Sequence, residues 1–160
     1  MSHPSLGAPP PDLTAGAAGA AERLVTGAAR LAARALEIAA EADPTMLERH
    51  DETALRHLQR DAETLLERIA RSLAADDVVF TREFADAIAP LYRRRHVPMD
   101  DLVSIIEGLR LAIAATLAPD ERAGADRAID AAVAAFRAYR RLAGDARKRN
   151  RLLAFLYKGA

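Results

Sequence analysis

Apolar residues recur every three or four positions along most of this chain, and charged residues interrupt every longer run of alanine and leucine. This spacing places the apolar side chains on one face of an α-helix, whereas a half-buried strand requires alternation at every second residue. Alanine, which favours helix, is the commonest residue, while Trp is absent and only four Phe and three Tyr occur. The sequence therefore predicts an all-α fold.

The length of 160 residues suits one domain that buries a core without disulfide bonds or metal ions. The first 20 residues contain four prolines and lack the basic and apolar regions of a signal peptide, so we expect a flexible leader over 1–20 and a helical domain over 21–160. No stretch is long and apolar enough for a transmembrane helix. The absence of Cys excludes disulfides and thiolate metal sites and fits a cytoplasmic protein.

Proline and aspartate residues divide the helical pattern into segments. One amphipathic helix is expected from about residue 14 to the dipeptide Asp43-Pro44, and a second long helix is expected from there to Asp76-Asp77. Three more helices begin near Asp76-Asp77, Pro98 and Pro119-Asp120. Pro90 predicts a kink or a boundary in the first of these three. We expect a bundle of five or six helices, with a globin-like packing as the alternative.

Motifs that support catalysis or metal binding are missing from the sequence. There is no Gly-x-Ser-x-Gly, no phosphate loop and no Gly-x-Gly-x-x-Gly motif. None of the four histidines follows a Glu by three residues, which is the pattern of a helical di-iron site. His50 and His57 would lie about 10 Å apart along one helix, too far to share a metal ion. We therefore predict a non-enzymatic protein without a metal site.

The charge balance argues against a nucleic-acid-binding surface, because 23 Lys and Arg residues are matched by 23 Asp and Glu residues. Any basic site must be local, and one such site is the Arg-rich run that ends at Pro98, a corner between two predicted helices. A bound anion or tetrapyrrole is one interpretation, and arginines that solvate the negative end of the preceding helix are the other. The candidate ligand- or partner-binding residues are Tyr92, Arg93, Arg95, His96 and Met99.

A second basic stretch lies near the C-terminus and is followed by apolar residues up to Tyr157. A closing helix that packs on the bundle or on a second subunit is the favoured interpretation of this segment. Contact with an anionic membrane surface is the alternative. The candidate partner or membrane contacts are Arg147, Lys148, Arg151 and Phe155.

Four parts of the sequence together resemble a known pattern, namely residues 65–69, residues 84–94, the turn HVPMDDL at 96–102, and a last helix with Phe136 and Tyr139. They look like the helical N-terminal sensory domain of RsbT co-antagonist proteins of bacterial stressosomes, and like related modules in PucR-type regulators. The resemblance implies a dimeric, bundle-like or globin-like sensor module without enzymatic activity. The turn also resembles the helical bundle that precedes cobalamin domains in bacterial regulators.

The expected function is that of a non-enzymatic, cytoplasmic sensor-like or adaptor domain that forms a homodimer and binds a protein partner of a regulatory stress-response system. Because no output domain follows in this sequence, we expect a stand-alone adaptor, antagonist or cargo-like protein. One alternative is a sensor for a tetrapyrrole or another small ligand, with His96 or His57 as the axial ligand of a haem. The other is a peripheral membrane protein that uses the segment from Arg147 to Tyr157.

Overall fold

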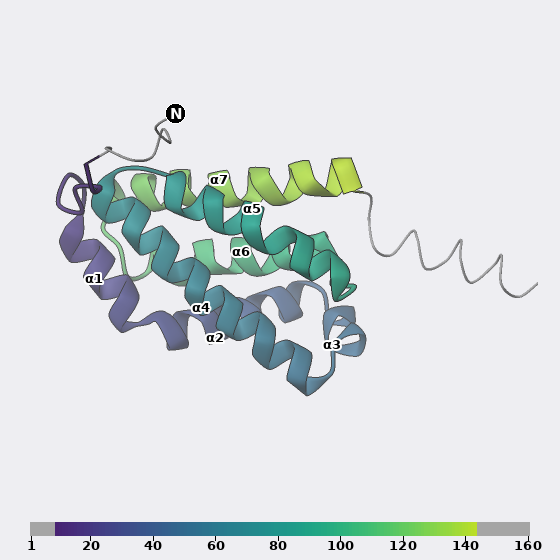
Figure 1. Ribbon diagram of the computed structural model, residues 1–160. Coiled ribbons are helices and arrows are strands. Elements are labelled where there is room, and N and C mark those ends of the chain that lie inside the picture. Colours follow the sequence, from purple (N-terminus) through teal and green to yellow (C-terminus); the bar gives the residue numbers. More distant parts are fainter. Residues whose placement is uncertain (1–8, 144–160) are drawn as a thin grey trace, which may run out of the picture.

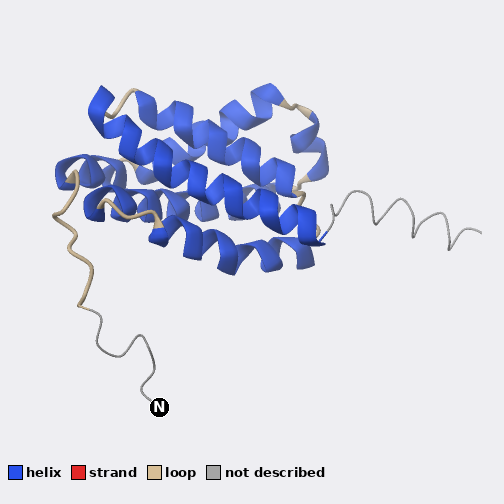
Figure 2. Cartoon of the chain, turned by 90° about the horizontal axis from the view of Figure 1, so that it is seen from above, coloured by secondary structure: helices blue, strands red, loops and turns tan. Residues whose placement is uncertain are grey.

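A computed structural model describes residues 9–143 of the chain, and the regular structure in this range consists of seven helices joined by short loops (Figures 1 and 2). The helices are α1 (Ala18–Thr26), α2 (Ala28–Ala42), α3 (Thr45–Arg49), α4 (Glu52–Ala75), α5 (Val79–Arg94), α6 (Met99–Ala114) and α7 (Pro119–Ala143). The predicted all-α class is confirmed. The predicted number of helices, five or six, was too low, because two of the expected helices are each divided in two.

The first expected helix is divided at Gly27, which lies between α1 and α2 with φ −92° and ψ 3°. Glycine is a poor helix former, so the backbone breaks at this residue. The pattern of apolar residues nevertheless continues past the break. The helix α1 begins at Ala18, inside the segment assigned to the leader. The residues just before it are fastened to the end of α4, because the amides of Gly16 and Ala17 donate to the carbonyls of Ala74 and Leu73 at 2.7 and 3.0 Å.

The second expected helix is divided at His50 and Asp51. The short helix α3 ends at Arg49, and His50 follows it with an extended backbone. Asp51 then caps α4 by accepting a hydrogen bond from the amide of Ala54 at 2.7 Å. A side-chain oxygen at the N-cap is a common way to begin a helix. The apolar pattern alone did not reveal this break, although the capping residue was present in the sequence.

The helix α5 passes through Pro90 without a boundary, so of the two predicted alternatives, a kink or a boundary, the boundary is excluded. A proline inside a helix leaves the carbonyl four residues earlier without its usual amide partner. That carbonyl belongs to Asp86, an exposed residue, where water can replace the missing amide. The predicted starts near Pro98 and Pro119 agree with α6 and α7.

The long helix α4 is the centre of the packing and contacts α1, α2, α5, α6 and α7. The core is built largely from aliphatic side chains, with Tyr92 and Phe136 in tilted contact at 6.5 Å between ring centroids. The pair α2 and α6 packs most closely, since a Cβ atom added to Gly108 would lie 2.4 Å from the carbonyl oxygen of Ala35. Small residues on α2, including Ala35 and Ala39, allow this approach.

The packing brings two corners that are distant in sequence to the same end of the molecule. Figure 1 shows α3, between α2 and α4, at the end where α5 finishes and α6 begins, whereas α1 lies toward the opposite end. Residues 43–57 therefore lie beside residues 92–101. Within the described range, every helix is too short or too polar to cross a bilayer.

We expect the substitution Gly108→Ala to lower the free energy of unfolding by about 1–3 kcal/mol, because the new methyl group meets backbone that cannot move aside easily. The matched control is Gly19→Ala in α1, where the nearest atom to an added Cβ is the flexible end of Arg23 at 3.9 Å. This control should raise stability by up to about 1 kcal/mol. Urea unfolding of both variants checks the account, and equal stability of Gly108→Ala and the wild type would contradict it.

Candidate functional site

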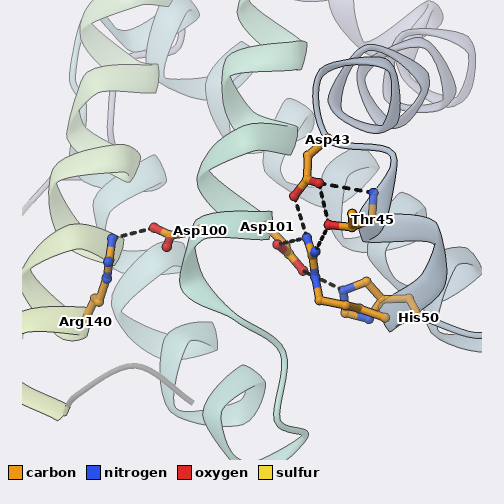
Figure 3. A network of polar contacts seen from close by, with 7 residues as sticks. Asp43, Thr45, His50, Asp100, Asp101 and Arg140 are labelled. Atoms are coloured by element: carbon orange, nitrogen blue, oxygen red, sulfur yellow. Dashed lines mark hydrogen bonds and ion pairs between the residues drawn. The ribbon is translucent and has the colours of Figure 1, made fainter. Parts of the chain in front are cut away.

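A buried carboxylate links the two corners. Asp101 lies in the first turn of α6 and is 2 % exposed. Its oxygens accept hydrogen bonds from Nη2 and Nε of Arg49 at 2.7 and 3.2 Å, and one of them lies 2.8 Å from Nε2 of His50 (Figure 3). A buried charge needs such partners, because its removal from water is costly. Asp101 therefore holds the end of α3 against the start of α6.

The same arginine also joins α3 to the end of α2. Nη2 of Arg49 donates to Oδ2 of Asp43 at 2.8 Å, and Nη1 donates to the hydroxyl of Thr45. Hydrogen bonds from Thr45, and then from Arg49, lower the pKa of Asp43 to about 2. The hydrogen bond to Asp101 is the largest influence on Arg49 and raises its pKa further. Both groups are thus charged at neutral pH, and the corner is held by charge-assisted hydrogen bonds.

A pocket of about 530 Å³ opens beside this link, between the start of α4 and the end of α5. All three histidines of the described range, His50, His57 and His96, contribute to its wall. The complete lining is Arg49, His50, Asp51, Thr53, Ala54, His57, Leu58, Tyr92, Arg95, His96 and Val97. Its volume lies within the usual range for sites that hold small molecules. We refer to this feature as the corner pocket.

The candidate residues of the Arg-rich run fall into two groups. Tyr92, Arg95 and His96 line the corner pocket. Arg93 is half-buried and is not among the lining residues, and Met99 is buried in the core at 4 % exposure. The run therefore contributes to the pocket through three of the five residues singled out in the sequence.

His96 has an unusual backbone conformation, with φ 58° in the left-handed region. It follows the end of α5, where its amide donates to the carbonyl of Arg93 at 3.1 Å and the amide of Val97 donates to the carbonyl of Tyr92 at 3.0 Å. These two bonds form a Schellman motif, in which glycine usually occupies the left-handed position. The side chain of His96 is thus carried into the pocket wall at some conformational cost.

Tyr92 forms a fixed part of the wall. Its hydroxyl donates to Oδ2 of Asp61 at 2.7 Å, and its side chain packs in the core. Burial, and next the hydrogen bond to Asp61, raises the pKa of Tyr92 above its ordinary value. The phenol is therefore neutral and acts as a donor to Asp61.

Three other lining side chains have no hydrogen-bond or ion-pair partner among residues 9–143. Arg95, His57 and His96 form no hydrogen bond or ion pair with any part of the chain that the structure describes. By contrast, Asp51 caps α4, and Arg49 and His50 are held by Asp101. The side chains available to a ligand are therefore mainly hydrogen-bond donors, together with the imidazole rings.

In the part of the chain that the structure describes, His50, His57 and His96 do not belong to a cluster of metal-binding side chains. Among residues 9–143, no group of three or more His, Cys, Asp or Glu side chains is placed to hold a metal ion. The fit to a tetrapyrrole is also poor, because only Ala54, Leu58 and Val97 are aliphatic among the eleven lining residues. A macrocycle needs apolar contact on both faces, whereas this lining suits a smaller and more polar ligand.

The candidate contacts near the C-terminus, Arg147, Lys148, Arg151 and Phe155, lie outside the described residues. Comparison of the sequence with protein-family models and with curated protein sequences finds no match to either. The resemblance to sensory domains of RsbT co-antagonist proteins therefore stays an expectation based on sequence.

Sequence reasoning missed Arg49, His50, Asp51 and Thr53 as pocket residues. The sequence did contain one signal, since Asp51 is a capping residue that brings a helix start to this point. The contact between Arg49 and Asp101 joins residues 52 positions apart. Only the tertiary packing of α3 on α6 brings these residues together.

We expect Asp101→Asn to lower the free energy of unfolding by about 2–3 kcal/mol, because it removes the buried charge to which Arg49 and His50 bind. The neighbouring Asp100→Asn is a matched control, since Asp100 pairs with Arg140 at a half-buried position that water reaches, with side chains 44 % and 42 % exposed. That control should change stability by less than about 1 kcal/mol. Chemical unfolding of both variants provides the measurement, and similar losses in the two would show that the buried link is not special.

We expect His96→Gly to raise the free energy of unfolding by about 0.5–1 kcal/mol, because glycine adopts the left-handed region without steric cost. Asp76→Gly is the control, since Asp76 has φ 50° at the end of α4 and does not line the corner pocket. His96→Gly should gain stability in thermal unfolding, and Asp76→Gly should gain less, because it also removes the exposed ion pair between Asp76 and Arg127. If His96→Gly alone lost stability, the imidazole of His96 would make stabilising contacts, and the steric cost of its left-handed backbone would not be the main effect.

Proposed function

We propose that this chain is a non-enzymatic, sensor-like helical domain whose input is a small ligand bound in the corner pocket. The observation that carries the proposal is that Arg49 and His50 belong both to the pocket wall and to the link with buried Asp101. A ligand that contacts either side chain changes the strength of the link between α3 and α6. Ligand occupancy and helix packing are coupled in this way.

The proposal extends to the output of the domain. A change at the link alters the position of the short helix α3, whose Leu47 is 53 % exposed. An exposed apolar side chain beside a movable corner suits contact with a regulatory protein partner. The expected homodimer, the globin-like arrangement of the helices and a role in a stress response also belong to this proposal, on the basis of the resemblance to RsbT co-antagonist sensory domains.

A tetrapyrrole is the alternative ligand, because His57 and His96 both line the pocket and either could serve as an axial ligand. The polar lining favours a smaller ligand over this alternative. Membrane binding through residues 147–157 is a third hypothesis, which rests on the sequence alone.

Ligand binding can be tested with four probes of different chemistry: pyrophosphate, benzoate, adenosine and haemin. Saturation-transfer NMR would follow the first three, and the Soret absorption band would follow haemin. The key variant is Ala54→Trp, which fills the pocket from the first turn of α4. The control is Arg60→Trp, at an exposed position of the same helix that does not line the pocket.

We expect at least one probe to bind the wild type and Arg60→Trp and to lose binding to Ala54→Trp. Circular dichroism and thermal unfolding establish that both variants are folded. Absence of binding by all four probes, or equal binding to Ala54→Trp, would overturn the proposal. A haemin signal alone would favour the tetrapyrrole alternative.

A further inference from the structure

We infer that the corner pocket recognises an oxyanion, a phosphate or carboxylate group on a small ligand, and that Arg95 with His57 and His96 forms the recognition set. This inference rests on the proposed ligand-binding function and names the chemical class of the ligand. The three side chains come from two elements that are distant in sequence, the first part of α4 and the corner after α5. The pocket is the one place where the fold brings them together.

The wall of the corner pocket has more hydrogen-bond donors without a partner than acceptors without one. Arg95 and the two imidazole rings have no hydrogen-bond or ion-pair partner among residues 9–143, although Arg95 carries a full positive charge and five N–H donors. The two nearby carboxylates each accept a hydrogen bond from within the protein. Asp51 accepts from the amide of Ala54, and Asp61 accepts from the hydroxyl of Tyr92. A ligand rich in acceptor oxygens therefore complements the wall better than a cation does.

The helix α4 points its N-terminus at the corner pocket. Asp51, Thr53 and Ala54 line the pocket at the N-terminus of α4, a helix of 24 residues. The cap satisfies the amide of Ala54, whereas the first amides of a helix have no partner inside the helix. Unpaired amides and the positive end of the helix dipole favour an anion beside them.

His96 lies on a corner whose backbone is held in place by its neighbours. Val97 and Tyr92 anchor the corner in the core at 8 % and 4 % exposure, and the left-handed conformation of His96 sets the direction of its side chain from this fixed support. An oxyanion bound at this corner orders the imidazole ring but not the backbone that carries it, which limits the loss of conformational entropy. The neighbouring Arg94 is also exposed, but it does not line the pocket.

Isothermal titration calorimetry with pyrophosphate and with citrate tests the inference and separates the phosphate and carboxylate sources. Adenosine is the neutral comparison. The test variants are Arg95→Ala, Arg95→Lys and His96→Gln, and the matched control is Arg94→Ala. Thermal unfolding of each variant shows whether the fold is retained, since all four substitutions lie at exposed positions.

We expect pyrophosphate or citrate to bind the wild type, with a loss of at least tenfold in affinity for Arg95→Ala, a smaller loss for Arg95→Lys and a several-fold loss for His96→Gln. Arg94→Ala should stay within twofold of the wild type. Equal losses for Arg94→Ala and Arg95→Ala would show general charge attraction and overturn the inference. Binding of adenosine alone, with loss in Ala54→Trp, would also overturn it while leaving the proposed function intact. Binding of none of pyrophosphate, citrate and adenosine would reject the inference, and the proposed function would be rejected with it only if benzoate and haemin also failed to bind.

Discussion

The buried contact between Arg49 and Asp101 is the interaction on which the candidate site depends. It crosses from the end of α3 to the start of α6, and His50 binds the same carboxylate. The helix α3 has only five residues and cannot hold its position by its own backbone hydrogen bonds. The ionic link, together with the burial of Met46 in the core, supplies this position, and the start of α4 follows from it. The wall of the corner pocket is therefore set by one carboxylate that is 2 % exposed.

The two sides of the pocket are supported differently. On one side, α3 and the first turn of α4 combine the burial of Met46 with polar contacts made by Asp43, Arg49 and Asp51. On the other side, the corner after α5 is anchored by the burial of Tyr92 and Val97. Polar contacts can be exchanged for contacts with a polar ligand, whereas apolar burial cannot. The larger share of polar contacts is the reason why we place the moving part of the proposed sensor at α3 and the fixed part at the end of α5.

Much of the fold follows from the sequence, since the helical class and the starts of α6 and α7 are predicted by apolar spacing and proline positions. The breaks at Gly27 and His50 could not be read from apolar spacing, because the pattern continues through them. Of the site, Tyr92, Arg95 and His96 were identified as a local run. Arg49 and His50 were not, because their role arises from a contact with Asp101 that depends on how α3 packs against α6. Such contacts are set by tertiary structure, and one sequence does not reveal them.

The most direct test of the account is a two-dimensional NMR titration of the whole chain with pyrophosphate. The amides of residues 49–57 and 95–97, the Nε signals of Arg49 and Arg95, and the amide of Asp101 should shift together with one binding constant. A shift at Asp101, which is buried behind the pocket wall, would show that occupancy reaches the link with α6. Shifts at Arg95 without any at Arg49, His50 and Asp101 would contradict the coupling that the account requires.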